Sequence, residues 1–392
     1  MTKIFNNTEV AFALKTDTEL DRAYFLFKMI ANEPLVRIGT AVTNFALKAH
    51  LPVEGLIRAT VFDHFCGGTT EDDCLTVVDK MFTKGVSSVL DYSVEGKTSA
   101  EDFEYTTKEI IATIHKAKGN PGIPFAVFKV TGISRFGLLE LTNNGIENIF
   151  ESELKEYHET VERVNRICKE AYEADVPVFI DAEESWIQDV IDRISHEMML
   201  KYNKERAIVF NTVQMYRHDR LEFLKNSIAW AKAENVQYGV KLVRGAYMEK
   251  ERKRAAENNY PSPIQPDKKT CDSDYDQALE FLTDPENFSQ MALCAGTHNE
   301  DSSAYLANLI ETKGIDKADK RIYFAQLLGM SDHISYTLAS NGFNVAKYVP
   351  YGPVKEVIPY LFRRADENTS VKGQTGRELN LIKEELKRRK GA

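Results

Sequence analysis

Two adjacent arginines, Arg363 and Arg364, are the residues whose types and spacing point most directly to chemistry. They lie near the end of a stretch, NVAKYVPYGPVKEVIPYLFRRADEN at 344–368, that predicts a strand ending in Tyr348, a tight Pro-Tyr-Gly-Pro turn and a helix. Neighbouring guanidiniums repel each other and are costly to desolvate, but together they bind a planar carboxylate well through paired N–H groups. The pair therefore suggests an anion site. The alternative is a solvated pair at a helix C-terminus, where cations suit the helix dipole.

Polar side chains also lie at the ends of several predicted strands. In chain order these residues are Lys129, Asp181 with Glu183 and Glu184, Gln214, Arg244 with Tyr247, Thr297 with His298 and Asn299, Gln326, and Tyr348. The carboxyl ends of parallel barrel strands form the active-site face. Polar groups at nearly every strand end therefore predict a catalytic mouth. For Lys129 and Asp181 a structural ion pair is an equal alternative.

One further cation, Lys241, lies inside the predicted strand GVKLVRG. A buried lysine needs an anionic or carbonyl partner, because burying it alone is expensive. The nearby Gly245 and Ala246 leave room for a flat ligand against the backbone. His298 is the one histidine at a predicted strand end, whereas metal sites in barrels draw on several histidines and carboxylates, so no metal site is predicted.

The elements that must position these residues alternate between strands and helices. Short apolar, β-rich runs lie at 87–93, 124–132, 176–184, 207–216, 237–247, 292–299, 322–330 and 344–352. Eight strands separated by helical stretches predict a (β/α)8 barrel. A doubly wound sheet is the competitor, but it usually binds dinucleotides through G-x-G-x-x-G, and that motif does not occur here.

Three parts are predicted along the chain: a helical N-terminal region at 1–85, the barrel at 86–370, and a basic C-terminal tail at 371–392. A charged segment at 248–290 forms a long excursion after the fifth strand. In the tail, Leu379, Ile382 and Leu386 form a narrow apolar stripe. The tail is interpreted as a solvated terminal helix, with contact to a membrane surface as the alternative.

Composition narrows the class of protein. The 392 residues carry a net charge of −9, which argues against a nucleic-acid partner. The five cysteines form no C-x-x-C pair, as expected for reduced thiols in a cytosolic protein. The N-terminus has no long apolar region typical of a secretory signal, and no run approaches the roughly 20 apolar residues of a membrane span. The predicted location is cytoplasmic, with peripheral attachment to the inner face of a membrane as a variant.

The strand-end motifs, taken in order, resemble the proline dehydrogenase family of flavoenzymes. The matching pieces are FKVTG, FIDAEES, NTVQMY, KLVRGAYMEKE, THN, FAQLLGMSD and YVPYGPVKEVIPYLFRRADEN, within residues 124–368. The resemblance implies a distorted (β/α)8 barrel that holds FAD without a Rossmann motif, with a final helix over the barrel mouth. It also implies oxidation of L-proline to Δ1-pyrroline-5-carboxylate by hydride transfer to flavin N5, the first step of proline catabolism.

The resemblance assigns roles position by position. Arg363 and Arg364 would clamp the proline carboxylate, Lys129 would add a cation there, and Asp181 would shape and polarise the pocket. Tyr247, Leu328 and Tyr348 would pack on the pyrrolidine ring. The flavin-contacting or supporting positions would be Thr212, Gln214, Lys241, Val243, Gly245, Ala246, His298, Asn299, Gln326 and Glu367. Met248 stands where many bacterial members have tryptophan, so an aromatic contact to the cofactor is lost there.

The implied partners are a quinone that accepts the electrons and a separate pyrroline-5-carboxylate dehydrogenase, because no aldehyde dehydrogenase domain is found in this sequence. Three other functions stay open. The first is a hydroxyproline dehydrogenase, against which the bulk of Tyr348 argues. The second is a Schiff-base aldolase using Lys129 or Lys241. The third is a non-catalytic sensor that binds a flavin or an amino acid.

Overall fold

A closed barrel of eight strands, in the order β1 to β8, forms the centre of the computed structural model. The structure describes residues 2–49, 51–94, 98–146, 149–370 and 374–391, without the side chains of 2, 3, 33, 37, 44–48, 365–370, 374 and 375. The strands are β1 (Val86–Tyr92), β2 (Phe125–Lys129), β3 (Val178–Asp181), β4 (Val209–Gln214), β5 (Tyr238–Val243), β6 (Met291–Gly296), β7 (Ile322–Leu327) and β8 (Val345–Tyr351). Each lies within or next to a predicted run, so the predicted barrel is confirmed.

Helices lead into the barrel and separate its strands. Before β1 lie α1 (Thr8–Ala11), α2 (Asp17–Ile30), α3 (Glu33–Lys48), α4 (Glu54–Ile57), α5 (Asp63–Phe65) and α6 (Glu71–Phe82). Between the strands lie α7 (Ala100–Ala117), α8 (Phe136–Asn143), α9 (Glu151–Ala174), α10 (Ser185–Tyr202), α11 (Arg220–Ala233), α12 (Met248–Glu257), α13 (Lys268–Leu282), α14 (Pro285–Phe288), α15 (Glu300–Thr312) and α16 (Asp332–Ser340). After β8 come α17 (Val354–Ser370) and α18 (Gln374–Arg389). The excursion predicted at 248–290 is thus largely helical.

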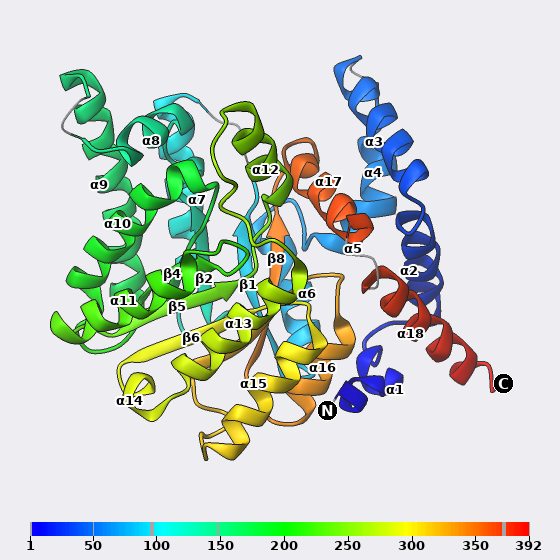
Figure 1. The fold of residues 1–392 in the computed structure, drawn as a ribbon. Coiled ribbons are helices and arrows are strands. Elements are labelled where there is room, and N and C mark those ends of the chain that lie inside the picture. The colour runs from blue at the N-terminus through cyan, green and yellow to red at the C-terminus, as the bar shows by residue number, and fades with distance from the viewer. Residues whose placement is uncertain (1, 50, 95–97, 147–148, 371–373, 392) are drawn as a thin grey trace. The chain divides into compact units, whose positions relative to one another are not determined.

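The chain forms two compact units. The first combines Met1–Glu95 with Gln326–Ala392, and the second is Gly96–Ala325. In the second unit, α7 packs on β2, and α10 and α11 pack on β4 (Figure 1). Helix α10 shows why: Ile187, Ile191 and Ile194 recur at helical spacing on one face, and all three are buried.

An aromatic cluster fills the second unit at the amino-terminal part of its strands. The ring centroids of Phe125 and Phe179 are 4.4 Å apart, and those of Phe179 and Phe210 are 5.3 Å apart. Side chains alternate along a strand, so Phe179 and Phe210 share a face with Asp181 and Gln214 nearer the carboxyl ends. A Cβ on Gly239 would lie 2.7 Å from the Phe210 ring, so glycine makes room for this cluster. The rings provide an apolar floor below the polar strand ends.

In the first unit, β8 pairs in parallel with β1 over its whole length, from Val86 with Val345 to Tyr92 with Tyr351. The strand therefore continues beyond Tyr348, which the sequence predicted as its last residue. The strand is longer than predicted because Tyr351 and the preceding proline pair in register with β1. Gly352, at φ +144°, then turns the chain into α17.

Helix α18 lies beside α2 in the first unit (Figure 1). Leu381 and Ile382 are buried in a cluster with Leu20 and Phe27 of α2. The apolar stripe considered for a membrane surface is therefore packed inside this unit. The predicted boundary at 371 falls outside the described residues. No helix in the described ranges has both the length and the apolar character needed to cross a bilayer.

Candidate active site

Three charged side chains meet at the carboxyl ends of β2, β3 and β5. Lys129 Nζ lies 2.8 Å from Asp181 Oδ2, and Lys241 Nζ donates to Asp181 Oδ1. Lys241 Nζ also lies 5.4 Å from the centre of the Phe179 ring. The sequence predicted an anionic or carbonyl partner for Lys241, and the structure shows an anionic one, Asp181. Two cations on one carboxylate leave the cluster with a net positive charge, which suits an anionic ligand group.

The Asp181 carboxyl keeps its negative charge despite its burial. Burial alone would raise its pKa, but the attraction of Lys129, followed by that of Lys241, lowers the pKa below the usual value. Asp181 is therefore a carboxylate at neutral pH. Because an ammonium held by a carboxylate is a poor nucleophile, this pairing argues against the Schiff-base aldolase.

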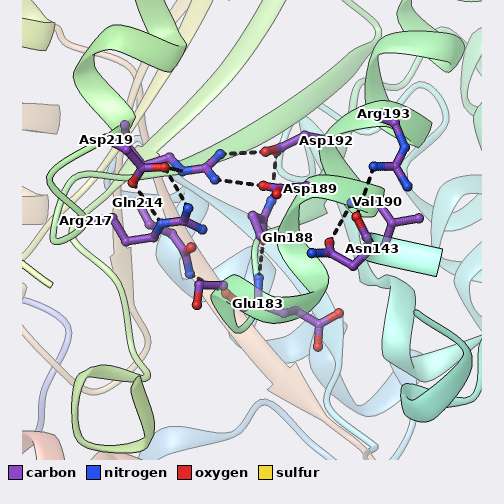
Figure 2. Close-up of polar contacts among 12 residues, drawn as sticks. Asn143, Glu183, Gln188, Asp189, Val190, Asp192, Arg193, Gln214, Arg217 and Asp219 are labelled. Carbon is purple, nitrogen blue, oxygen red and sulfur yellow. Dashed lines mark hydrogen bonds and ion pairs between the residues drawn. The ribbon is translucent and has the colours of Figure 1, made fainter. Parts of the chain in front are cut away.

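Gln214 ends β4 and brings a carboxamide to the same end of the strands. Its Nε2 donates to the backbone oxygen of Glu183 at 3.0 Å (Figure 2), whereas its buried Oε1 has no partner among the described residues. Thr212, two residues earlier, is committed to the strand itself, because its Oγ1 donates to the Ile180 oxygen at 2.8 Å. Gln214 therefore offers an acceptor to a ligand, and Thr212 supports the strand pair.

Glu183, two residues after Asp181, is a buried carboxyl with a different partner set. It accepts a hydrogen bond from the Thr131 backbone N–H at 3.1 Å and another from the Thr131 hydroxyl. Burial raises its pKa to about 7 against the lowering effect of these bonds, and the nearby Glu184 raises it further. Thus Asp181 and Glu183, two residues apart in the chain, have pKa values moved in opposite directions.

The segment after β5 places backbone and small residues at the surface. Gly245 and Ala246 are exposed, whereas Tyr247 is buried. Gly245 has φ +131°, and a Cβ there would lie 2.5 Å from the Tyr216 ring, so only glycine fits. Val243 is half-buried, and its carbonyl accepts from Met215 N at 2.8 Å. An exposed small-residue backbone at this position agrees with room for a flat ligand.

His298 and Asn299 follow β6, and both are half-buried. Asn299 is the N-cap of α15, where its Oδ1 accepts from Asp301 N at 2.8 Å and from Ser302 N at 3.1 Å. This cap satisfies donors that a helix start leaves open. Asn299 therefore has a structural role, whatever it contacts in a ligand complex.

In the first unit, the ends of β7 and β8 lie side by side. Leu328 N donates to the Tyr348 oxygen at 2.9 Å, which joins two residues expected to pack on a substrate ring. Tyr348 is buried and Leu328 is half-buried. Gln326 is also buried, and its Oε1 accepts from Ser335 Oγ at 2.8 Å.

Both arginines of the predicted carboxylate clamp lie on α17. Arg363 is half-buried and Arg364 is buried, with its guanidinium carbon 5.1 Å from the centre of the Tyr360 ring. The burial of Arg364 differs from the solvated pair that was the alternative, whereas Arg363 keeps partial contact with solvent. The side chain of Glu367 lies outside the described residues.

The residues fit a flavin in one respect that the structure itself shows: the buried, unpartnered Oε1 of Gln214 beside the cationic cluster of Lys129 and Lys241. A flavin ring carries both an N–H donor and electron-rich carbonyl oxygens, so it can satisfy an acceptor and a cation together. Across the described part of the chain, no group of three or more metal-ligating side chains occurs.

Sequence reasoning missed the polar residues behind β3 and β4: Gln188 and Asp192 of α10, Asn211 of β4, and Arg220 of α11. The sequence did hold a clue to two of them, since Gln188 and Asp192 lie four residues apart among the isoleucines of α10. Polar residues on an apolar helix face need partners inside the protein. That signal does not name the partners.

A closed parallel barrel with buried charged and polar groups at the carboxyl ends of its strands has the architecture of a (β/α)8-barrel enzyme. The sequence matches the family described as proline dehydrogenase over residues 74–377. The chain therefore belongs to the proline dehydrogenase family, and its predicted membership of this oxidoreductase family is confirmed.

Relatives of this chain agree with the family match. "Proline dehydrogenase 1, mitochondrial" of Arabidopsis thaliana is 33% identical over 95% of this chain and 83% of the relative. The protein of the same name in Dictyostelium discoideum is 32% identical over 99% of this chain and 75% of the relative. "Hydroxyproline dehydrogenase" of Xenopus laevis is 29% identical over 96% of this chain and 88% of the relative.

The mitochondrial names of the Arabidopsis and Dictyostelium relatives correct the predicted cytoplasmic location. Cysteine usage and the lack of an apolar N-terminal run could not distinguish these compartments.

Among solved structures, proline utilization A (PutA) from Bdellovibrio bacteriovorus, inactivated by N-propargylglycine, has a TM-score of 0.72 and 19% identity to this chain. The likeness covers 97% of this chain and 39% of the PutA chain, and it shows the shared fold.

Proposed function

We propose that this chain oxidises L-proline to Δ1-pyrroline-5-carboxylate with FAD as its cofactor. One observation carries the proposal, namely the match to the proline dehydrogenase family over residues 74–377. The cationic cluster at Lys129, Asp181 and Lys241 supports it, because such a cluster suits an anionic substrate or an electron-rich cofactor edge.

When bound, FAD would supply a hydride acceptor that no side chain can replace. Gln214 and Lys241 would hold it from the strand ends, with Gly245 and Ala246 supplying open backbone beside it. Arg363 and Arg364 would fix the carboxylate of proline, and Tyr348 and Leu328 would orient its ring. Fixing the carboxylate restricts the ring carbon to one approach, which is a proximity effect.

A quinone is proposed as the acceptor of the electrons, and a separate dehydrogenase would consume the product. The sequence contains no G-x-G-x-x-G fingerprint for a nicotinamide cofactor. Reduced enzyme should therefore reoxidise quickly with a soluble quinone analogue and slowly with NAD. Rapid formation of NADH would contradict this acceptor.

The visible spectrum of the purified chain, recorded before and after adding L-proline, tests the main proposal. Flavin absorbance that bleaches with proline is expected, and heating should release a fluorescent flavin. A colourless protein that gains no flavin absorbance on adding FAD would contradict the proposal. Coloured protein that proline does not bleach would indicate a sensor.

Hydroxyproline is a second candidate substrate, because a relative named hydroxyproline dehydrogenase aligns over 96% of this chain. Tyr348 tests the choice. If its ring occupies the space of a 4-hydroxyl group, Tyr348→Ser should lower kcat/KM for proline and lose less for hydroxyproline. An unchanged ratio between the two substrates would mean that Tyr348 does not select between them.

A further inference from the structure

Gln188 of α10 joins the candidate active site to the layer between the barrel and its helices. Its Oε1 accepts from Glu183 N at 2.8 Å, and its Nε2 donates to Asp192 Oδ1 at 2.8 Å (Figure 2). The side chain is 1% exposed, so water cannot replace either bond without rearrangement. Any movement of Gln188 would therefore displace the Glu183 backbone.

Glu183 in turn holds two strand ends. Its carbonyl accepts from Gln214 Nε2 at 3.0 Å, and its carboxyl accepts from the Thr131 N–H at 3.1 Å. Thr131 lies two residues after Lys129, in the turn that follows β2. The backbone position of Glu183 therefore governs both the direction of the Gln214 carboxamide and the turn beside Lys129.

Asp192 fixes the other end of this chain of contacts. Its Oδ1 also accepts from Asn211 Nδ2 at 2.8 Å, and its Oδ2 accepts from Arg220 Nη1 at 2.6 Å. Asp192 and Arg220 are buried, and Arg220 makes a second ion pair, to Asp189 at 3.2 Å. A buried carboxylate that accepts from two carboxamides and a guanidinium has few alternative geometries, so Asp192 is held in place.

We propose that Gln188, Asp192 and Arg220 form a positioning relay that sets Gln214 and the Lys129 turn for ligand binding. None of the three is placed in the cofactor or substrate contacts, so they act through Glu183. Because Gln214 Nε2 is committed to the Glu183 carbonyl, the relay also fixes Oε1 as the atom that Gln214 presents to a ligand. The effect on cofactor binding rests on the proposed function; the effect on the strand ends does not.

Gln188→Met tests the relay because it keeps the side-chain length and removes both hydrogen bonds. Gln290→Met is the matched control: Gln290 precedes β6, at the amino end of that strand, and its Nε2 donates to the Ala231 oxygen at 3.4 Å. Amide hydrogen exchange of the full chain should become about tenfold faster at residues 128–133 and 212–216 in the Gln188 variant. Losing the two Gln188 hydrogen bonds lowers the free energy of local opening at these residues. Equal exchange at these residues in both variants would overturn the proposal.

The dissociation constant for FAD gives a second readout. It should rise about tenfold in Gln188→Met and stay near the parent value in Gln290→Met. If the Gln188 variant fails to fold, Thr131→Val and Thr131→Ser replace it: valine removes the hydroxyl that bonds Glu183, and serine restores it. Recovery of FAD affinity by serine supports the relay, and equal affinity in the two Thr131 variants overturns it.

These experiments separate a failure of the proposed function from a failure of the relay. A parent chain that binds no FAD would remove the proposed function, and the exchange comparison would still decide the relay.

Discussion

Two buried charge clusters, one in each compact unit, differ in where their residues come from. In the second unit, Asp192 is held by Gln188, Asn211 and Arg220, which come from three consecutive elements of the barrel. In the first unit, Asp332 pairs with Lys347 of β8 at 2.8 Å and with Lys15, near the N-terminus, at 3.4 Å.

Buried charged residues therefore have two different structural roles in this fold. The cluster of the second unit supports strand ends from immediately behind them. The cluster of the first unit joins segments from both chain ends to the loop between β7 and α16. Glu378 of α18 belongs to this arrangement, because its Oε2 accepts from Ser331 N at 3.0 Å.

The largest expected effect is the loss of a buried cation. Breaking a buried ion pair from one side typically costs about 3–5 kcal/mol. Arg220→Met and Lys347→Met should both lower the free energy of unfolding by about this amount, with Arg220→Met nearer the upper end. Asp332 keeps Lys15 as a partner, whereas Asp192 would keep amides only. Urea denaturation of both variants measures which one loses more unfolding free energy. A larger loss in Lys347→Met than in Arg220→Met would contradict this prediction.

Glu183 should make the free energy of unfolding depend on pH through a group of the second unit. Its pKa of about 7 in the folded chain lies above its usual value of 4.5. Between these two values the folded state holds a proton that the unfolded state has released, so the free energy of unfolding should fall as pH rises through this window. The fall from this group is at most about 3 kcal/mol.

Glu183→Gln should flatten that slope, and the difference from the parent can be measured by urea denaturation between pH 4.5 and 8. Parallel curves for parent and variant would show that Glu183 does not titrate there.

The arginines of α17 test the ligand role of the first unit. Removing one charged partner of a desolvated carboxylate costs about 2–5 kcal/mol, so Arg363→Met and Arg364→Met should each lower kcat/KM for proline by roughly 30-fold or more. Flavin content should stay at the parent level. Kinetics near the parent values in both variants would return the pair to a structural role.

The smallest expected effect concerns α18. Glu378→Ala leaves the Ser331 N–H without its acceptor, which costs about 1–2 kcal/mol. Ser331 has a positive φ of 53°, so the loop from Leu328 to Ser331 depends on such support. The KM for proline should rise severalfold, whereas Glu384→Ala, an exposed site on the same helix, should leave it unchanged. Equal KM values would confine α18 to a packing role.

The polar residues at the strand ends could be predicted from the sequence for a physical reason. In a parallel barrel the carboxyl ends of all strands lie on one face, so a polar residue that ends an apolar run is a site candidate before any coordinates are known. Lys129, Asp181 and Gln214 were found in this way. Glu183 was noticed for its position, but its partners Thr131 and Gln188 were not.

By itself, the sequence predicted the eight-stranded barrel and the residues at its strand ends, because these follow from local periodicity and composition. It also indicated that Lys241 must have an anionic or carbonyl partner. Only the tertiary structure decided that this partner is Asp181, that β8 runs on to Tyr351, and that the basic tail packs on α2. Each depends on contacts between residues far apart in the chain, and neither hydrophobic periodicity nor residue type specifies which distant groups will meet.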